Sequence, residues 1–186
     1  MRTIKKNCLA VVLMLTLCLT CLLPVQAASA KSMALDAYRA YMERQYSSLE
    51  FGLIYLDKDS IPELVLSNGA IYTYKKASGM SLLQDDHEFD YQKYYKKKGV
   101  IYSDIIPGAV MDYDVGYYSR VSGGKLVRLC SFDHYNSGKW VYYNTKYKKI
   151  SKTKFNSLIK KRVGNKKATK IKYHKNNASD RAKYLG

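Results

Sequence analysis

The fold is decided by the stretch Asp112-Tyr-Asp-Val-Gly-Tyr-Tyr-Ser-Arg-Val-Ser-Gly-Gly-Lys-Leu-Val-Arg-Leu-Cys-Ser-Phe132. Its first half has a period of two, which is typical of a β-strand, because successive side chains of a strand point to opposite faces. One face would carry Tyr113, Val115, Tyr117, Ser119 and Val121. The dipeptide Gly123-Gly124 then predicts a tight turn, and the apolar run 125–132 predicts a returning strand. The stretch therefore predicts an antiparallel hairpin.

Similar runs continue outward from this hairpin at the short, regular spacing of an antiparallel meander. Turns are predicted at Asn68-Gly69, Ser78-Gly79, 96–99 and 136–138. The strand-like runs are 51–57, 63–67, 71–75, 80–83, 91–95, 100–105, 140–143 and a short edge strand at 169–173. The chain has 19 tyrosines, which suit half-exposed strands because the ring packs while the hydroxyl meets water.

Helices are predicted at both ends of this strand region. Residues 32–50 carry an apolar stripe that includes Leu35, Tyr38 and Met42, with Ser32 as the N-cap. Residues 151–163 form a second helix, which Ser151 would cap and Gly164 would end, and 177–185 form a short last one. The core face of the second helix consists of Phe155, Leu158, Ile159 and Val163. The sequence therefore predicts an α+β fold: a single curved antiparallel β-meander sheet with an N-terminal helix and C-terminal helices.

The first 30 residues have the pattern of a secretory signal peptide. Arg2, Lys5 and Lys6 precede an apolar run, and small residues then allow cleavage after Ala27 or Ala30. The alternative is a membrane anchor, although Pro24 and the small residues favour removal. We expect a secreted or cell-surface-associated protein, with residues 31–186 forming one monomeric domain that has no transmembrane segment.

Cleavage would leave Cys130 as the only one of the four cysteines. One thiol cannot form an internal disulfide, so the exported domain would depend on its core. Cys130 lies in an apolar strand-like run, which favours a small buried hydrophobic residue over a reactive thiol.

The loop between the first two strands reads Leu56-Asp-Lys-Asp-Ser-Ile-Pro-Glu-Leu-Val65. It resembles the calcium loop of FG-GAP/VCBS-type β-propeller repeats, D-x-D-x-D-G-x-x-[DE]-L. Asp57, Asp59 and Glu63 stand at acidic positions of that pattern, whereas Tyr55 replaces its first acid and Ser60 its turn glycine. The resemblance implies weak calcium binding by these three carboxylates, since alternate loop positions converge on one hard cation. The alternative is a loop whose acids cap a turn. A single copy cannot build a propeller.

The layout as a whole resembles small exported proteins of unknown function from low-GC Gram-positive bacteria. The shared features are the short first helix, the strand pair around Asp57, the tyrosine-rich meander and the ending Asn177-Ala-Ser-Asp-Arg-Ala-Lys-Tyr-Leu185. This resemblance implies no activity.

Charge is distributed very unevenly along the chain. The 186 residues carry a net charge of +17. Residues 31–138 contain 13 Lys and Arg against 14 Asp and Glu, whereas 139–186 contain 16 against the single acid Asp180. A lysine-rich composition would raise lysine everywhere, but it would not remove acids from one segment only. The two interpretations of this segment are a surface for a polyanion and compositional drift. The cations expected to face an anionic partner are Lys152, Lys154, Lys160, Lys161, Arg162, Lys166, Lys167, Lys170, Lys172 and Lys175.

Two functions of different classes follow. The first is an exported, non-catalytic binding or cell-envelope-associated protein whose basic surface contacts an anionic envelope polymer or lipid headgroups. Nucleic acid is a weaker candidate partner, because the sequence has no recognisable nucleic-acid-binding motif. The alternative is a small secreted hydrolase or inhibitor that uses the Asp57 loop or the acids around His87 (Asp85, Asp86, Glu88 and Asp90). No catalytic signature such as G-x-S-x-G or H-E-x-x-H supports an enzyme, and no cofactor is predicted apart from calcium.

Overall fold

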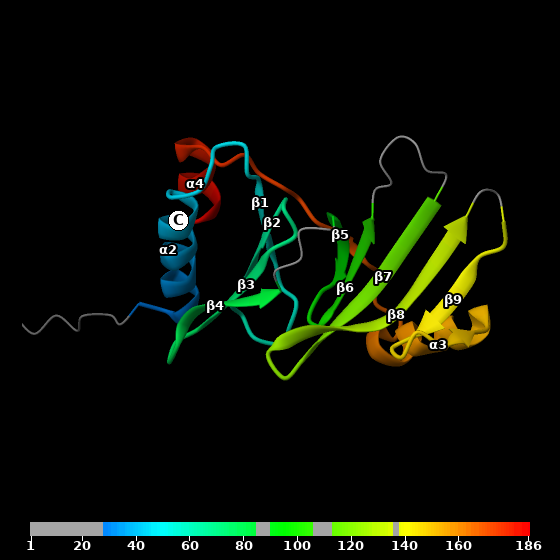
Figure 1. Cartoon of the computed structure of the whole chain (residues 1–186). Coiled ribbons are helices and arrows are strands. Elements are labelled where there is room, and N and C mark those ends of the chain that lie inside the picture. The colour runs from blue at the N-terminus through cyan, green and yellow to red at the C-terminus, as the bar shows by residue number, and fades with distance from the viewer. Residues whose placement is uncertain (1–27, 85–89, 106–112, 136–137) are drawn as a thin grey trace, which may run out of the picture.

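The computed structural model describes residues 28–84, 90–105, 113–135 and 138–186. Within these ranges the chain forms three helices and eleven strands, and the strands make two antiparallel sheets (Figure 1). The predicted signal peptide and the predicted turn at 136–138 lie largely outside the described residues. The α+β class is confirmed, with one helix before the strands and two near the C-terminus.

The smaller sheet has four strands in the order β1-β2-β3-β4. Their bounds are β1 Phe51–Ile54, β2 Glu63–Leu66, β3 Ile71–Lys75 and β4 Gly79–Gln84. β1 and β2 pair antiparallel, as predicted for 51–57 and 63–67. The turns at 68–69 and 78–79 are also confirmed, and both use a glycine with positive φ, 86° at Gly69 and 74° at Gly79.

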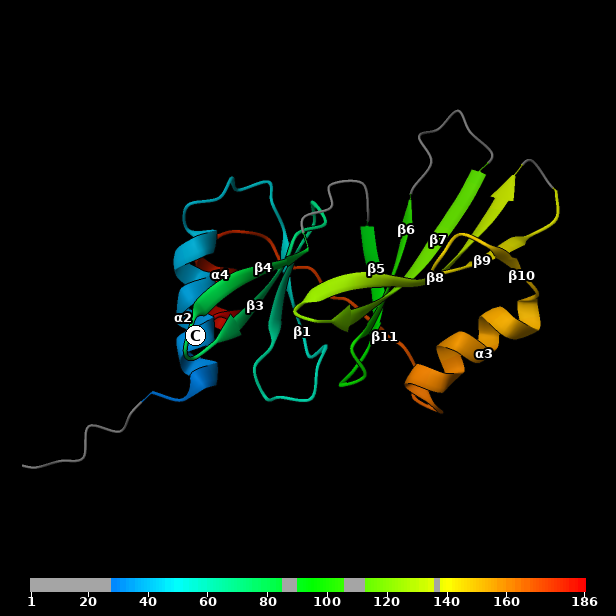
Figure 2. The same cartoon turned by 60° about the horizontal axis from the view of Figure 1, so that its bottom comes forward.

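The larger sheet has seven strands in the order β10-β9-β8-β7-β6-β5-β11. The long β7–β8 pair is the hairpin predicted from residues 112–132, and its turn uses Gly123 and Gly124 at φ 60° and 73°. The sheet is open and not strongly curled (Figure 2). The strand bounds are β5 Asp90–Tyr95, β6 Val100–Ile105, β7 Tyr113–Ser122, β8 Lys125–Tyr135, β9 Val141–Asn144, β10 Lys149–Ile150 and β11 Thr169–Lys170.

The prediction of a single sheet is wrong, because β1 to β4 form one sheet and β5 to β11 form another. The reason is visible in β2, whose four residues are all buried. Leu64 and Leu66 belong to a core with α2 (Ala30–Met42), whereas Val65 belongs to a core with Ile101 of the larger sheet. Since both faces of the smaller sheet are covered, it cannot continue the half-exposed surface of the larger one.

The helices cover the outer faces of the two sheets. α2 and α4 (Ala178–Tyr184) lie on the smaller sheet, and α3 (Lys152–Val163) lies on the larger one near β8 and β9 (Figures 1 and 2). Both predicted ends of α3 are confirmed: the Ser151 side chain accepts a hydrogen bond from Lys154 N, and Gly164 has φ 61°. Phe155 and Val163 are buried as predicted.

The first helix differs from its predicted extent of 32–50. Its N-cap is Ser29 rather than Ser32, and its last residue is Met42. Beyond Met42, Tyr46 is 84 % exposed, whereas Leu49 is half-buried against the same core as α2. Residues 43–50 turn toward β1 instead of continuing the helix.

Residues 169–174, which we call the connecting segment, join the edges of both sheets. Thr169 and Lys170 form β11, which pairs with β5 at the edge of the larger sheet. Four residues later His174 pairs with Phe51 of β1, with its N–H donating to the Phe51 carbonyl at 2.7 Å. The predicted alternation is confirmed, since Ile171 is buried while Lys170 and Lys172 are exposed. The segment passes close to Gly52, where a Cβ atom would lie 2.9 Å from the Lys172 carbonyl oxygen.

Candidate functional site

The acidic loop follows β1, and its two aspartates bind the loop's own backbone. Asp57 Oδ1 accepts a hydrogen bond from Asp59 N at 2.9 Å, and Asp59 Oδ1 accepts one from Ile61 N at 2.8 Å. Both are Asx turns, in which the side chain replaces a backbone acceptor and fixes the loop. Partial burial raises the pKa of Asp57, and the nearby Asp59 carboxylate adds to that effect.

Glu63 lies on β2 and is buried within the fold. Its side chain is 3 % exposed, and its Oε2 accepts a hydrogen bond from Leu56 N at 2.8 Å. Burial raises the pKa of Glu63 to about 8, and the charges of Asp57 and Asp59 contribute. Glu63 therefore ties the start of the loop to β2 rather than opening toward solvent.

The three predicted calcium ligands thus have separate structural uses. Within the part of the chain that the structure describes, no three His, Cys, Asp or Glu side chains gather in a way that could hold a metal ion. Weak calcium binding by Asp57, Asp59 and Glu63 stays a prediction. The second acidic cluster, at 85–88, lies outside the described residues, as does the side chain of Asp90.

Cys130 and His134, among the described residues, each have their own structural surroundings. Cys130 is fully buried, and burial raises the pKa of its thiol to about 12. His134 stacks on Trp140 with ring centroids 4.4 Å apart, and its Nδ1 lies 3.8 Å from Asp114 Oδ2. The arrangement around Cys130 fits the expected small hydrophobic residue of a core.

The predicted cations of the C-terminal quarter lie on the surface of the protein. All ten cations expected to face an anionic partner are exposed: Lys152, Lys154, Lys160, Lys161, Arg162, Lys166, Lys167, Lys170, Lys172 and Lys175. Five of them lie on α3, whose opposite face packs Phe155 against β8 and β9. Asp180, the one acid of this quarter, accepts a hydrogen bond from Lys175 N and lies in the first turn of α4.

A groove of about 330 Å³ lies where the connecting segment passes β1, β5 and α4. Its basic lining consists of Lys170 and Lys172, which belong to the predicted set. Among the described residues, the lining consists of Leu53, Tyr55, Tyr94, Thr169, Lys170, Lys172, His174 and Tyr184. Lys170, Lys172 and His174 share one face of the connecting segment because they are two residues apart.

The aromatic side chains of this groove are held by close contacts. His174 stacks on Tyr184 with ring centroids 3.6 Å apart and planes at 19°. Tyr94 is 7 % exposed and forms a buried part of the wall. Partial burial lowers the pKa of His174, and Lys183 and Lys172 lower it further, although Asp180 opposes them, so the neutral imidazole is favoured at pH 7.

Additional ammonium groups lie over two of these tyrosine rings. Lys96 Nζ is 5.3 Å and Lys31 Nζ 6.0 Å from the centroid of the Tyr55 ring. Lys183 Nζ is 5.0 Å from the centroid of the Tyr184 ring. Such contacts hold cations beside an aromatic face. The groove therefore combines aromatic walls with positive charge.

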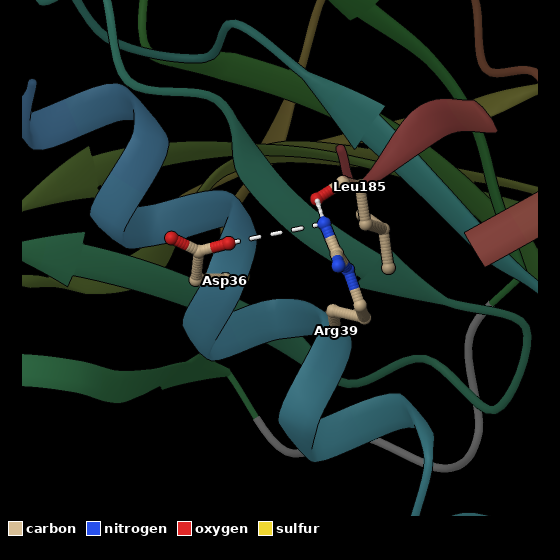
Figure 3. Close-up of polar contacts among 3 residues, drawn as sticks. All are labelled: Asp36, Arg39 and Leu185. Atoms are coloured by element: carbon tan, nitrogen blue, oxygen red, sulfur yellow. Dashed lines mark hydrogen bonds and ion pairs between the residues drawn. The ribbon is translucent and has the colours of Figure 1, made fainter. Parts of the chain in front are cut away.

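The C-terminal residues that supply Tyr184 are anchored to α2. Arg39 Nη2 donates to the Leu185 carbonyl oxygen at 3.0 Å and lies 3.8 Å from Asp36 Oδ1 (Figure 3). Leu185 is fully buried against α2 residues such as Tyr38. These contacts fix α4, and with it one wall of the groove.

A second pocket between the two sheets is smaller and more polar. It has a volume of about 90 Å³ and includes Ser103, Ser119 and Arg128 in its lining. The Arg128 guanidinium lies 4.1 Å from the Tyr117 ring centroid and 4.6 Å from that of Tyr147. The volume is sufficient for several water molecules but not for a segment of a polymer.

The sequence predicted the lysines of the groove but not its aromatic residues. Tyr55 was noted only as a departure from the calcium-loop pattern, and Tyr94, His174 and Tyr184 come from three other segments. The only local signal was the alternation of 169–173, which places two lysines on one outer face.

Comparison with known proteins adds no relative: no protein-family model, no curated protein and no solved structure matches this chain. Among the described residues, none of the helices is both long enough and apolar enough to cross a membrane.

Proposed function

We propose that this protein is an exported, non-catalytic binding protein that associates with the cell envelope through its basic surface. Its partners would be anionic envelope polymers or lipid headgroups. The observation that carries the proposal is that all ten predicted cations are exposed, in a quarter of the chain that contains one acid. The signal-peptide pattern of residues 1–30 supports export.

Each of these contacts would be weak alone. A lysine near an anionic membrane surface contributes about 1 kcal/mol, and the interaction decays within a Debye length of about 8–10 Å. Several exposed lysines acting together would hold the protein at the surface at physiological salt. Retention should therefore fall steeply at about 1 M salt, where the Debye length is about 3 Å.

The test measures how the mature protein divides between washed cells and medium. We expect the wild type to sediment with cells at low salt and to be released by about 1 M NaCl. Replacing Lys160, Lys161, Lys166 and Lys167 with Gln should release it at low salt without unfolding it, because all four side chains are exposed.

A matched control removes the same number of charges elsewhere. Lys58, Lys76, Lys98 and Lys125 are exposed and lie outside the basic quarter. Their replacement by Gln should leave retention close to wild type. Equal loss in both variants would show that net charge alone acts, and wild-type protein that stays bound at high salt would contradict an electrostatic association.

A further inference from the structure

We infer that the groove at the connecting segment binds a sugar unit of an anionic glycan polymer, one that carries phosphate or carboxylate groups. This inference rests on the proposed function and deepens it, because it names the ligand class and the place where the polymer is recognised. The remaining cations on α3 would then add non-specific attraction beside a specific site.

The charge of the groove fits an anion. Lys170 and Lys172 line it, and none of its eight lining residues within the described part of the chain is Asp or Glu. Lys96 and Lys183 lie over Tyr55 and Tyr184, two of its wall residues. Lysine is a point charge with three donors, so it binds a phosphate or carboxylate without demanding one geometry. A repeating polyanion suits such a site.

The remaining lining fits a polyhydroxylated ligand. Tyr55, Thr169 and Tyr184 each bring a hydroxyl that can donate and accept a hydrogen bond. The neutral His174 imidazole, which partial burial favours, has one donor and one acceptor nitrogen. Ligand sites commonly combine aromatic walls with a few such polar groups, and about 330 Å³ lies at the lower end of their volumes.

The same geometry disfavours a nucleobase. A base would need an open ring face for stacking. Here one face of Tyr184 is covered by His174, while lysine ammonium groups lie over Tyr55. The tyrosines therefore offer edges and hydroxyls more than free platforms. A recessed groove walled by β1, β5 and α4 also differs from the open lysine face that a bilayer surface would contact.

The experiment measures binding of the mature protein to four probes by titration calorimetry at one fixed ionic strength. The probes are purified sugar-substituted teichoic acid, inorganic polyphosphate, single-stranded DNA and phosphatidylglycerol vesicles. The groove variant is Lys172→Gln with Tyr184→Phe, which keeps the ring that stacks on His174. The comparison variant is the Lys160, Lys161, Lys166 and Lys167 to Gln protein.

We expect the groove variant to lose about tenfold in affinity for teichoic acid and less than threefold for polyphosphate, because only the former presents sugar hydroxyls. The comparison variant should weaken the binding of both polymers equally. Thermal unfolding of each variant checks that the fold is intact, and Tyr184→Phe alone should still weaken teichoic acid if the first double variant is unstable.

Other outcomes would overturn the inference. Equal losses of affinity for teichoic acid and polyphosphate in the groove variant would show that the groove contributes charge only and does not recognise a sugar. Tightest binding to DNA or to vesicles, with the largest loss in the groove variant, would assign it to another ligand class. Teichoic acid binding that depends only on the four lysines of the comparison variant would exclude the groove as the site and keep the proposed function. An absence of binding to any polyanion would contradict both proposals.

Discussion

Glu63 shows how one residue can fit a motif and have a different role in the fold. The sequence placed it as the last acid of a calcium loop, but β2 is covered on both faces, so its side chain is buried. A buried carboxylate loses hydration, and this raises its pKa to about 8 even though Leu56 N donates to it. A residue pattern shows which acids are present. It does not show which of them the packing will bury.

The raised pKa of Glu63 makes stability depend on pH. In the unfolded chain the carboxyl titrates near its ordinary value of 4.5, and in the folded protein near 8. Between these values the folded state holds the extra proton, so the stabilisation is complete below about pH 4.5 and is lost as pH rises through 8.

We therefore expect Glu63→Gln to flatten this dependence and to stabilise the protein at pH 8.5 by on the order of 2 kcal/mol relative to wild type. Urea unfolding at pH 5.5 and pH 8.5 measures both values. Asp57→Asn, at the more exposed end of the loop, provides the comparison. A wild-type stability that rises from pH 5.5 to 8.5 would contradict the assignment.

At the scale of elements, the sequence predicted the boundaries that local signals set, and it missed the boundaries that distant contacts set. The hairpin β7–β8 and helix α3 were predicted well because alternation, glycine turns and caps lie within the elements themselves. The end of α2 was not. Asn176, 134 residues away, donates from Nδ2 to the Met42 carbonyl oxygen at 2.9 Å and to the Tyr46 carbonyl at 3.1 Å. No local pattern contains such a partner.

Asn176 therefore acts as a C-terminal cap supplied from outside the helix. It is 4 % exposed, and its Oδ1 accepts a hydrogen bond from Arg181 Nη1 at 2.9 Å. Asn176→Asp keeps the shape but removes both N–H donors, which leaves buried carbonyls facing a carboxylate. We expect a loss of about 2–4 kcal/mol in the free energy of unfolding.

Chemical denaturation of the Asn176→Asp variant measures this loss. The same change at the exposed Asn165 provides the control and should cost less than about 0.5 kcal/mol. Similar values at both positions would show that the end of α2 is set by its own sequence. The Asn176→Asp variant should also disturb the geometry of the groove, since Asn176 links α2 to α4.

For the whole molecule, the division into two sheets could not be read from strand periodicity. The run Leu64-Val-Leu66 has the continuous apolar character of a strand covered on both sides, but three residues alone do not say what covers each face. The structure supplies α2 on one face and the larger sheet on the other. The groove was not predicted for the same reason: its walls come from separate segments, which lie together only because the connecting segment joins both sheets.

This joined architecture should unfold as one unit. Ile171 is 5 % exposed and packs in one core with Ile54 and Val65 of the smaller sheet and with Tyr94 and Ile101 of the larger one. Its neighbours Lys170 and His174 pair with the two sheet edges. Removing its side chain should therefore weaken both sheets together.

We expect Ile171→Ala to lower the free energy of unfolding by about 2–4 kcal/mol, which is the usual cost of such a cavity. Hydrogen exchange followed by mass spectrometry should show faster exchange, by a common factor, in peptides from β1–β3 and from β6–β8. Leu82→Ala, at a side chain that is 47 % exposed on β4, should change neither set. Faster exchange confined to the smaller sheet would mean that the two sheets unfold separately, and the connecting segment would then be an edge contact of one sheet rather than the joint between them.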